Sequence, residues 1–215
     1  MRRDRGLTPQ MIMEGINQEF DEGIIVTDVG QHQMWATQYI DLNEKKRFIT
    51  SGGLGTMGFG FPAAIGAKIG CPDKEVICIT GDGGFQMNIQ ELETLVRLQL
   101  PVKIFIWNNQ GYASIRSMQN NNFGGFQVAS GESSGLSMPD TVKVAAAYGL
   151  KTFRIMDNKQ LEQQIEEVLD AEGPVLCELM ISPDETVSPR TKTIVHEDGT
   201  CLLYTSPSPR DRQKS

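Results

Sequence analysis

The sequence has no apolar run long enough to span a bilayer, and its first residues lack the apolar core of a secretory signal peptide. Basic residues are in the minority, with 20 Lys and Arg against 27 Asp and Glu and a net charge of −7. Nucleic acids and anionic membranes both favour clustered Lys and Arg, so this balance argues against either as a partner. We therefore expect a cytoplasmic protein with no nucleic-acid or membrane partner.

Cysteine is scarce and carries no metal-binding pattern. Cys71, Cys78, Cys177 and Cys201 form neither a Cys-x-x-Cys pair nor another ligand spacing. Cys78 and Cys177 stand inside apolar, strand-like runs, so we expect small buried hydrophobic residues rather than ligands, and no disulfide framework. A hydrophobic content of 39% and a charged content of 22% are typical of a globular domain.

Apolar runs rich in β-branched residues alternate with helical patterns along the chain. The first helix is expected at 7–20, behind the start signal Thr8-Pro9. Another is expected after Asn88, which with Glu91 resembles a capping box. Strands are expected at 24–29, 47–50, 76–79, 102–107, 151–155 and 175–180. This alternation predicts an α/β fold, a doubly wound, mostly parallel six-stranded sheet flanked by helices.

The end of the chain differs from the rest in composition. We place the folded domain at 7–182 and a C-terminal extension at 183–200. The segment 201–215 has no hydrophobic periodicity and is rich in Ser and Pro, which predicts disorder. It also resembles translated vector sequence, so we expect a non-native tail.

The stretch from Gly81 to Gly111 is the most informative one. The apolar run at 76–79 leads into Gly81-Asp82-Gly83, and the run at 102–107 leads into Asn108-Asn109. Parallel strands deliver both ends to the carboxyl edge of the sheet, where open α/β sheets bind ligands. A carboxylate, an amide oxygen and a backbone carbonyl there suit Mg²⁺ holding a phosphate.

Two earlier segments are compatible with either a binding or a structural role. Gln31 and His32 open a helix after the strand at 24–29, where backbone N–H groups can hold an anion or simply form a turn. The glycines at 51–62 permit close approach to a ligand or tight helix packing, and Met57 among them suits a ligand contact or the core. The Walker A ending is absent, so nucleotide binding is not indicated.

The Gly-Asp-Gly turn, the helix and strand after it, and the Asn pair 24 residues on resemble the signature of thiamine diphosphate (ThDP) enzymes. The segments 29–35, 51–62 and 81–88 resemble the acetolactate synthase branch in particular. The resemblance implies that 7–182 is the pyrophosphate-binding domain of a longer enzyme. Its cofactor-binding residues would be Val29, Gly30, Gln31, His32, Gly55, Met57, Gly81, Asp82, Gly83, Gly84, Asn109 and Gly111.

The same resemblance implies roles for these residues. Mg²⁺ would be held by the side chains of Asp82 and Asn109 and by the carbonyl of Gly111. The diphosphate would contact a second set, Gln31, His32, Gly83 and Gly84. The Gly55 carbonyl would accept a hydrogen bond from the cofactor's 4′-amino group, and Met57 would bend the cofactor into a V.

By the same resemblance, the reaction would be decarboxylation of pyruvate and carboligation to a second 2-oxo acid, a step of branched-chain amino acid biosynthesis. No catalytic residue is expected in this chain, because the activating glutamate of the family lies on a pyrimidine-binding domain, usually of the partner subunit. We therefore expect inactivity without that domain, a homo-oligomer such as a dimer, and FAD only in the full enzyme, bound mainly elsewhere.

One departure from the family concerns the acceptor pocket. Met118 stands where acetolactate synthases usually have a tryptophan. Another ThDP-dependent 2-oxo acid decarboxylase, carboligase or C–C hydrolase is therefore an alternative. A non-catalytic module that binds a metal-phosphate ligand or a partner chain is an alternative of a different class.

Overall fold

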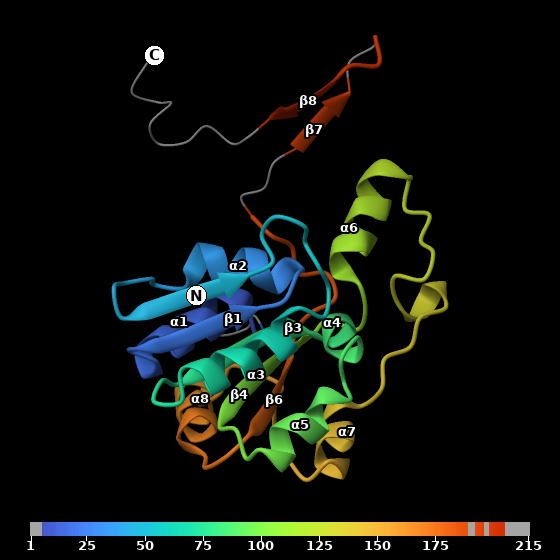
Figure 1. Ribbon diagram of the computed structural model, residues 1–215. Helices are drawn as coiled ribbons and strands as arrows, with labels where there is room; N and C mark the ends of the chain where they lie inside the picture. Colours follow the sequence, from blue (N-terminus) through green and yellow to red (C-terminus); the bar gives the residue numbers. More distant parts are fainter. Residues whose placement is uncertain (1–5, 189–191, 196–197, 205–215) are drawn as a thin grey trace. The chain divides into compact units, whose positions relative to one another are not determined.

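The computed structural model describes residues 6–188, 192–195 and 198–204, and it divides at Glu185 into two compact units. The first unit is built on a six-stranded sheet in the order β2-β1-β3-β4-β6-β5, with every neighbouring pair parallel (Figure 1). The predicted doubly wound α/β class is confirmed. The strands are β1 (Gly23–Thr27), β2 (Lys46–Thr50), β3 (Val76–Gly81), β4 (Val102–Asn108), β5 (Lys151–Ile155) and β6 (Val175–Met180).

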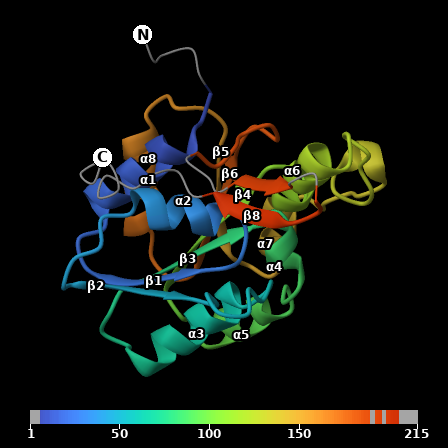
Figure 2. The same ribbon diagram turned by 90° about the horizontal axis from the view of Figure 1, so that it is seen from above.

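Helices cover both faces of this sheet, as parallel strands require. Figure 2 shows α1, α2 and α8 on one side of the sheet and α3 and α5 on the other. The α-helices are α1 (Pro9–Glu19), α2 (Gln31–Tyr39), α3 (Gly60–Gly70), α4 (Asp82–Gln86), α5 (Glu91–Arg97), α6 (Ala113–Asn122), α7 (Thr141–Ala147) and α8 (Leu161–Asp170), and Glu132–Ser134 form a 3₁₀ turn. Among the described residues, no helix has the length and apolar character needed to cross a membrane.

The buried strands explain why their sequences read as continuous apolar runs. In β1, β3 and β4 nearly every side chain is buried, because each face of the sheet packs against helices. Cys78 and Cys177 are fully buried in β3 and β6, which confirms the expectation of small core residues. The core therefore holds the carboxyl ends of β1, β3 and β4 in fixed positions.

Local sequence signals predicted the start of α1 correctly and the start of α5 incorrectly. The Thr8 side chain accepts a hydrogen bond from the Met11 N–H, so α1 begins as predicted. The expected capping box at Asn88 is wrong. The Asn88 amide instead donates to the carbonyl of Gly58 at 2.6 Å, and α5 begins two residues later, without a side-chain cap. The Asn88 side chain thus makes a tertiary hydrogen bond and not the capping hydrogen bond expected from the sequence.

The second unit contains an antiparallel pair, β7 (Lys192–Val195) and β8 (Cys201–Tyr204). Disorder was expected from Cys201 onward, whereas in the structure Cys201–Tyr204 form β8. Asp198 accepts hydrogen bonds from the N–H and hydroxyl of Thr200, and Gly199 adopts φ +81°, so a turn returns the chain to pair with β7. The remainder of the predicted tail, 205–215, lies outside the described residues.

Candidate functional site

The predicted site lies at the carboxyl edge of the sheet. From β1 the chain passes to β2 on one side of β1 and then to β3 on the other side. This reversal makes the boundary between β1 and β3 a topological switch point. Gln31 follows β1, Asp82 follows β3 and Asn109 follows β4. The strand order therefore brings together three loops separated by up to 78 positions in the sequence (31 to 109).

A cavity of about 70 Å³ joins these loops. Its lining includes every predicted cofactor residue except Gly55: Val29, Gly30, Gln31, His32, Met57, Gly81, Asp82, Gly83, Gly84, Asn109 and Gly111. Gly55 is exposed with φ +69°, and a Cβ on it would lie 3.8 Å from the Val29 side chain. The cavity is small for a whole cofactor.

Asp82 is the central charged group of this cavity. Its side chain is buried at the start of α4, where Oδ1 accepts from the Gly83 N–H at 2.8 Å and Oδ2 from the Gly111 N–H at 2.9 Å. Burial raises the pKa of Asp82 to about 6, against the opposing effects of these backbone donors and of Arg116. A cation close to the carboxylate would lower this pKa and stabilise the charged form.

Three buried polar atoms at this cavity have no hydrogen-bond partner. They are Asn109 Oδ1, His32 Nε2 and Gln31 Oε1. Buried polar atoms are almost always satisfied in folded proteins, so unpartnered atoms that converge on one cavity indicate a missing ligand. Asn109 Oδ1 is a hard oxygen suited to Mg²⁺, and His32 Nε2 can donate to a phosphate oxygen only when the ring carries a proton on that nitrogen.

His32 is packed between two glycine positions. A Cβ on Gly30 would lie 2.8 Å from the His32 ring, and one on Gly81 would lie 3.1 Å from it. Burial lowers the pKa of His32 to about 4, although a hydrogen bond with the Asp28 backbone raises it. The ring is therefore neutral at pH 7, and Nε2 is its unpartnered nitrogen.

Asp28 organises the glycine-rich segment, a role that the sequence did not indicate. Both carboxylate oxygens accept from the Gly58 N–H at 3.0 Å, and Thr80 and Val29 donate to the same carboxylate at 3.2 and 2.7 Å. Desolvation nonetheless raises the pKa of Asp28. Asp28 thus ties the end of β1 to the segment that carries Met57.

Tyr112 lines the other wall of the cavity, and Arg116, which is not among the lining residues, holds the loops behind it. The Arg116 guanidinium donates to the carbonyls of Asn109, Ser130 and Pro183 at 3.1, 3.2 and 2.9 Å. The Tyr112 ring lies over Gly83, where an added Cβ would come within 2.3 Å of it. Neither residue was expected from the sequence, and Met118 of the same segment is exposed on α6 and does not line the cavity.

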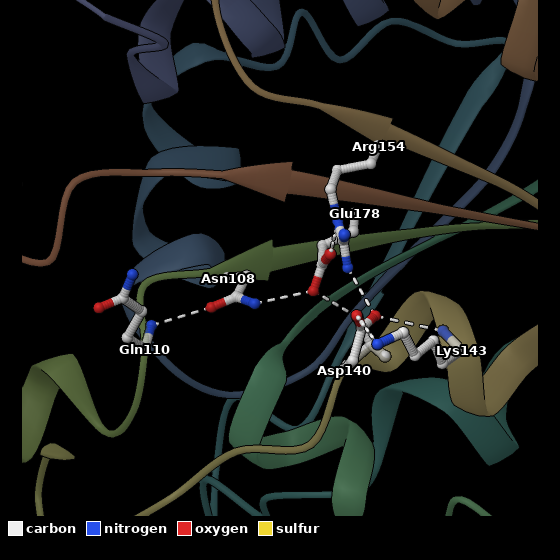
Figure 3. Close-up of polar contacts among 7 residues, drawn as sticks. Asn108, Gln110, Asp140, Lys143, Arg154 and Glu178 are labelled. Atoms are coloured by element: carbon white, nitrogen blue, oxygen red, sulfur yellow. Dashed lines mark hydrogen bonds and ion pairs between the residues drawn. The ribbon is translucent and has the colours of Figure 1, made fainter.

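A second polar cluster, missed in the sequence, lies beside Asn108. Glu178 is buried on β6 and accepts from Asn108 Nδ2 at 2.7 Å and from Arg154 Nε at 2.5 Å (Figure 3). Arg154 also pairs with Asp140 at 2.6 Å. The one sequence signal was a carboxylate inside an otherwise apolar strand.

The donor atoms of the cavity are consistent with a metal ion coordinated partly by the protein and partly by a bound phosphate group. Within 6–188 and the other described residues, no group of three or more His, Cys, Asp or Glu side chains could hold a metal ion alone. Asp82 is the one carboxylate among the residues lining the cavity. Mg²⁺ is characteristically bound by one or two carboxylates together with substrate phosphates, so the residues present fit that ion.

Comparison with known proteins places this arrangement in a family. A family profile described as "Thiamine pyrophosphate enzyme, C-terminal TPP binding domain" matches residues 28–179. The chain is 42% identical over 183 residues to the acetolactate synthase large subunit of Cyanidium caldarium, covering 85% of this chain and 31% of that protein. It is 43% identical over 166 residues to the acetolactate synthase isozyme 2 large subunit of Escherichia coli K12, covering 77% and 30%.

A third relative is the probable acetolactate synthase large subunit of Methanocaldococcus jannaschii, 42% identical over 193 residues, covering 86% of this chain and 32% of that protein. The chain thus spans about a third of the length of the curated relatives it matches. The resemblance to the acetolactate synthase branch is confirmed. The chain belongs to the thiamine pyrophosphate enzyme family, of which it carries the C-terminal TPP binding domain.

Proposed function

We propose that this chain binds Mg²⁺ and the diphosphate of ThDP at the cavity between β1, β3 and β4. Completed by a pyrimidine-binding domain, it decarboxylates pyruvate and joins the product to a second 2-oxo acid. One observation carries the proposal: the buried Asn109 Oδ1 has no partner and lines the same cavity as the buried Asp82 carboxylate. A carboxylate and an unpartnered amide oxygen in one small cavity form the protein half of a metal-diphosphate site.

The residues divide into three groups by the atoms they offer. Asp82, Asn109 and the Gly111 carbonyl would hold Mg²⁺. The diphosphate would be held by Gln31, His32, Gly83 and Gly84, helped by neutralisation of its charge by the metal. Gly55 and Met57 would contact the pyrimidine end.

The cofactor itself supplies carbanion stabilisation, and the protein supplies binding, orientation and a site shielded from water. This chain's cavity contains one carboxylate, Asp82, among its lining residues, and that group is committed to backbone donors. The activating glutamate would therefore come from the pyrimidine-binding domain or subunit. A homo-oligomer in the cytoplasm, FAD in the full enzyme and a role in branched-chain amino acid biosynthesis remain predictions.

Met118 favours a second candidate. Met118 is exposed on α6, and a flexible methionine in place of the family's tryptophan would give the acceptor pocket a different shape. The alternative is another ThDP-dependent decarboxylase, carboligase or C–C hydrolase. Product analysis with pyruvate, alone and with 2-oxobutyrate, after the pyrimidine-binding domain has been supplied, distinguishes these reactions.

Isothermal titration calorimetry of the full chain with ThDP and Mg²⁺ tests the binding proposal. We expect Mg²⁺-dependent binding that weakens at least tenfold, about 1.4 kcal/mol, in Asp82→Asn. The exposed Asp73→Asn is the matched control and should bind as the wild type does. Equal binding by both variants, or binding that persists in a chelator, would contradict the metal role of Asp82.

A turnover assay tests the missing catalytic group. The full chain is incubated with pyruvate, ThDP and Mg²⁺ in the absence of any other domain. We expect no acetolactate. Robust turnover by the chain alone would show that the activating acid is present in this chain and would contradict this part of the proposal.

A further inference from the structure

Glu178 is a buried charge in a strand that is otherwise apolar. It lies near the carboxyl end of β6, in the run Val175–Met180, and only 1% of its surface is exposed. Burying a carboxylate is costly unless donors satisfy it, so its position requires an explanation. The hydrogen-bond donors that its two carboxylate oxygens meet provide that explanation.

The two oxygens have different partners. Oε1 accepts from Asn108 Nδ2 at 2.7 Å and from Thr141 Oγ1 at 2.5 Å, while Oε2 accepts from Arg154 Nε at 2.5 Å. Arg154 stands opposite Glu178 in the β5/β6 register, and Asp140 holds its other end. The ion pair therefore fixes Glu178, and Glu178 in turn presents Oε1 to the end of β4.

This fixes the amide of Asn108 in one orientation. Only its NH₂ group can donate to Glu178, so its Oδ1 must point the other way, where it accepts from the Gln110 N–H at 3.0 Å (Figure 3). An amide flip would place the carbonyl oxygen against a carboxylate. The side chain of Asn108 thus closes a turn around Asn109.

The turn needs such support because its backbone is strained. Gln110 adopts φ +61°, a left-handed conformation that is uncommon for residues other than glycine, and Gly111 follows at φ +136°. Within this turn lie the unpartnered Asn109 Oδ1 and the Gly111 N–H that reaches Asp82. A relaxed turn would move both atoms away from the cavity.

We propose that Glu178 is a positioning residue for the metal-binding turn 108–111. Through Asn108 it holds the strained backbone that aims Asn109 Oδ1 and joins Gly111 to Asp82. The inference rests on the proposed Mg²⁺ site for its functional consequence, whereas the ordering of the turn is a property of the metal-free chain. Glu178 touches neither cofactor nor metal in this scheme.

Two variants disturb the arrangement that orients Asn108, and one leaves it intact. In Glu178→Gln, the ion pair with Arg154 that fixes the side chain is lost, and the new NH₂ group must face either Arg154 or the Asn108 amide. Asn108→Asp keeps the acceptor for Gln110 but sets a carboxylate against Glu178. Thr141→Val removes one donor from the same Oε1 and leaves the Asn108 link, so it is the matched control.

The first measurement needs no cofactor. Amide hydrogen exchange of the metal-free full chain by NMR should be at least tenfold faster at Gln110 and Gly111 in Glu178→Gln and Asn108→Asp. Exchange at Ile104, in the middle of β4, should stay as in the wild type, and Thr141→Val should match the wild type at Gln110 and Gly111. Unchanged exchange at Gln110 and Gly111 would overturn the inference. Faster exchange along the whole of β4 would also overturn it, because the role would then be merely structural.

The second measurement is the affinity for Mn²⁺, as a spectroscopic substitute for Mg²⁺, in the presence of ThDP. We expect Kd to rise at least tenfold in the two linked variants and to stay within twofold in Thr141→Val. A loosened turn with unchanged Mn²⁺ affinity would overturn the positioning role. A wild-type chain that binds no Mn²⁺ with ThDP would overturn the proposed function, and the exchange data would still decide whether Glu178 orders the turn.

Discussion

The N–H of Gly111 donates to Oδ2 of Asp82 over 2.9 Å, and this bond joins the turn after β4 to the first residue of α4. The two residues are 29 positions apart, and each follows the end of its own parallel strand. The bond holds Asp82 and the Asn109 turn together through contacts within the chain, so the protein itself would preorganise the proposed site. Preorganisation lowers the conformational cost of binding a metal-diphosphate group.

Two glycines of α3 provide a matched pair for testing how closely the glycine-rich segment packs on β1. A Cβ at Gly60 would lie 2.6 Å from the backbone nitrogen of Asp28, whereas a Cβ at Gly66 would meet nothing within 4 Å. We expect Gly60→Ala to destabilise the fold by about 2 kcal/mol through backbone displacement. Gly66→Ala should stabilise it by about 0.5–1 kcal/mol through helix propensity. Urea denaturation measures both, and equal effects would contradict the close contact.

The carboxylate of Asp28 should contribute to stability through its position between β1 and the glycine-rich segment. An amide at position 28 offers one acceptor oxygen, so Asp28→Asn must leave Gly58, Thr80 or Val29 facing an NH₂ group. We expect a loss of about 2 kcal/mol. Thr80→Val removes one donor and should cost about 1 kcal/mol, so a larger loss in Thr80→Val would point away from Asp28 as the organising group.

His32 should make stability fall in acid. Its folded-state pKa of about 4 lies below its ordinary value of 6.5, because burial disfavours the charged ring. Above pH 6.5 the ring is neutral in both states. As the pH falls from 6.5 toward 4, the unfolded state gains a proton that the folded state does not, and stability decreases.

Comparison with His32→Gln isolates this contribution. The raised pKa values of Asp28 and Asp82 act in the opposite direction, but they do so in both proteins and cancel in the difference. On lowering the pH from 7 to 5, the wild type should lose about 2 kcal/mol relative to the variant. Denaturant midpoints measured at pH 7, 6 and 5 test this, and parallel curves would show that the ring is not buried as described.

Arg116 should stabilise the loops beside the site. Its guanidinium satisfies the carbonyls of Asn109, Ser130 and Pro183, so Arg116→Ala leaves three acceptors to find water. We expect a stability loss of about 1–3 kcal/mol together with weaker Mg²⁺ and ThDP binding. Arg97→Ala, an exposed arginine on α5, is the control and should change stability by less than about 0.5 kcal/mol.

Tryptophan fluorescence can report the binding part of that experiment. Trp35 and Trp107 are buried with ring centroids 5.7 Å apart, and Trp107 directly precedes the Asn pair. If Arg116→Ala bound ThDP and Mg²⁺ with wild-type affinity in a fluorescence titration, the guanidinium would have no part in orienting Asn109.

The sequence by itself determined the fold class and the location of the site. Hydrophobic periodicity located all six strands of the main sheet within about two residues at each end, because burial on both faces leaves continuous apolar runs. The positions of the Gly-Asp-Gly turn and the Asn pair after two such runs also predicted that these segments meet, since strands of a parallel sheet end at one edge. The structure places all of the cofactor residues expected from that resemblance at the cavity except Gly55, which lies beside Val29.

The tertiary structure alone decided which polar groups support that site. Asp28 with Gly58, Glu178 with Asn108, and Asn88 with Gly58 are pairs 30 to 70 residues apart in sequence. Periodicity shows which face of an element is buried, but not which distant donor a buried carboxylate or amide will meet. Those partners follow from strand order and register, and so does the orientation that leaves Asn109 Oδ1 without a partner.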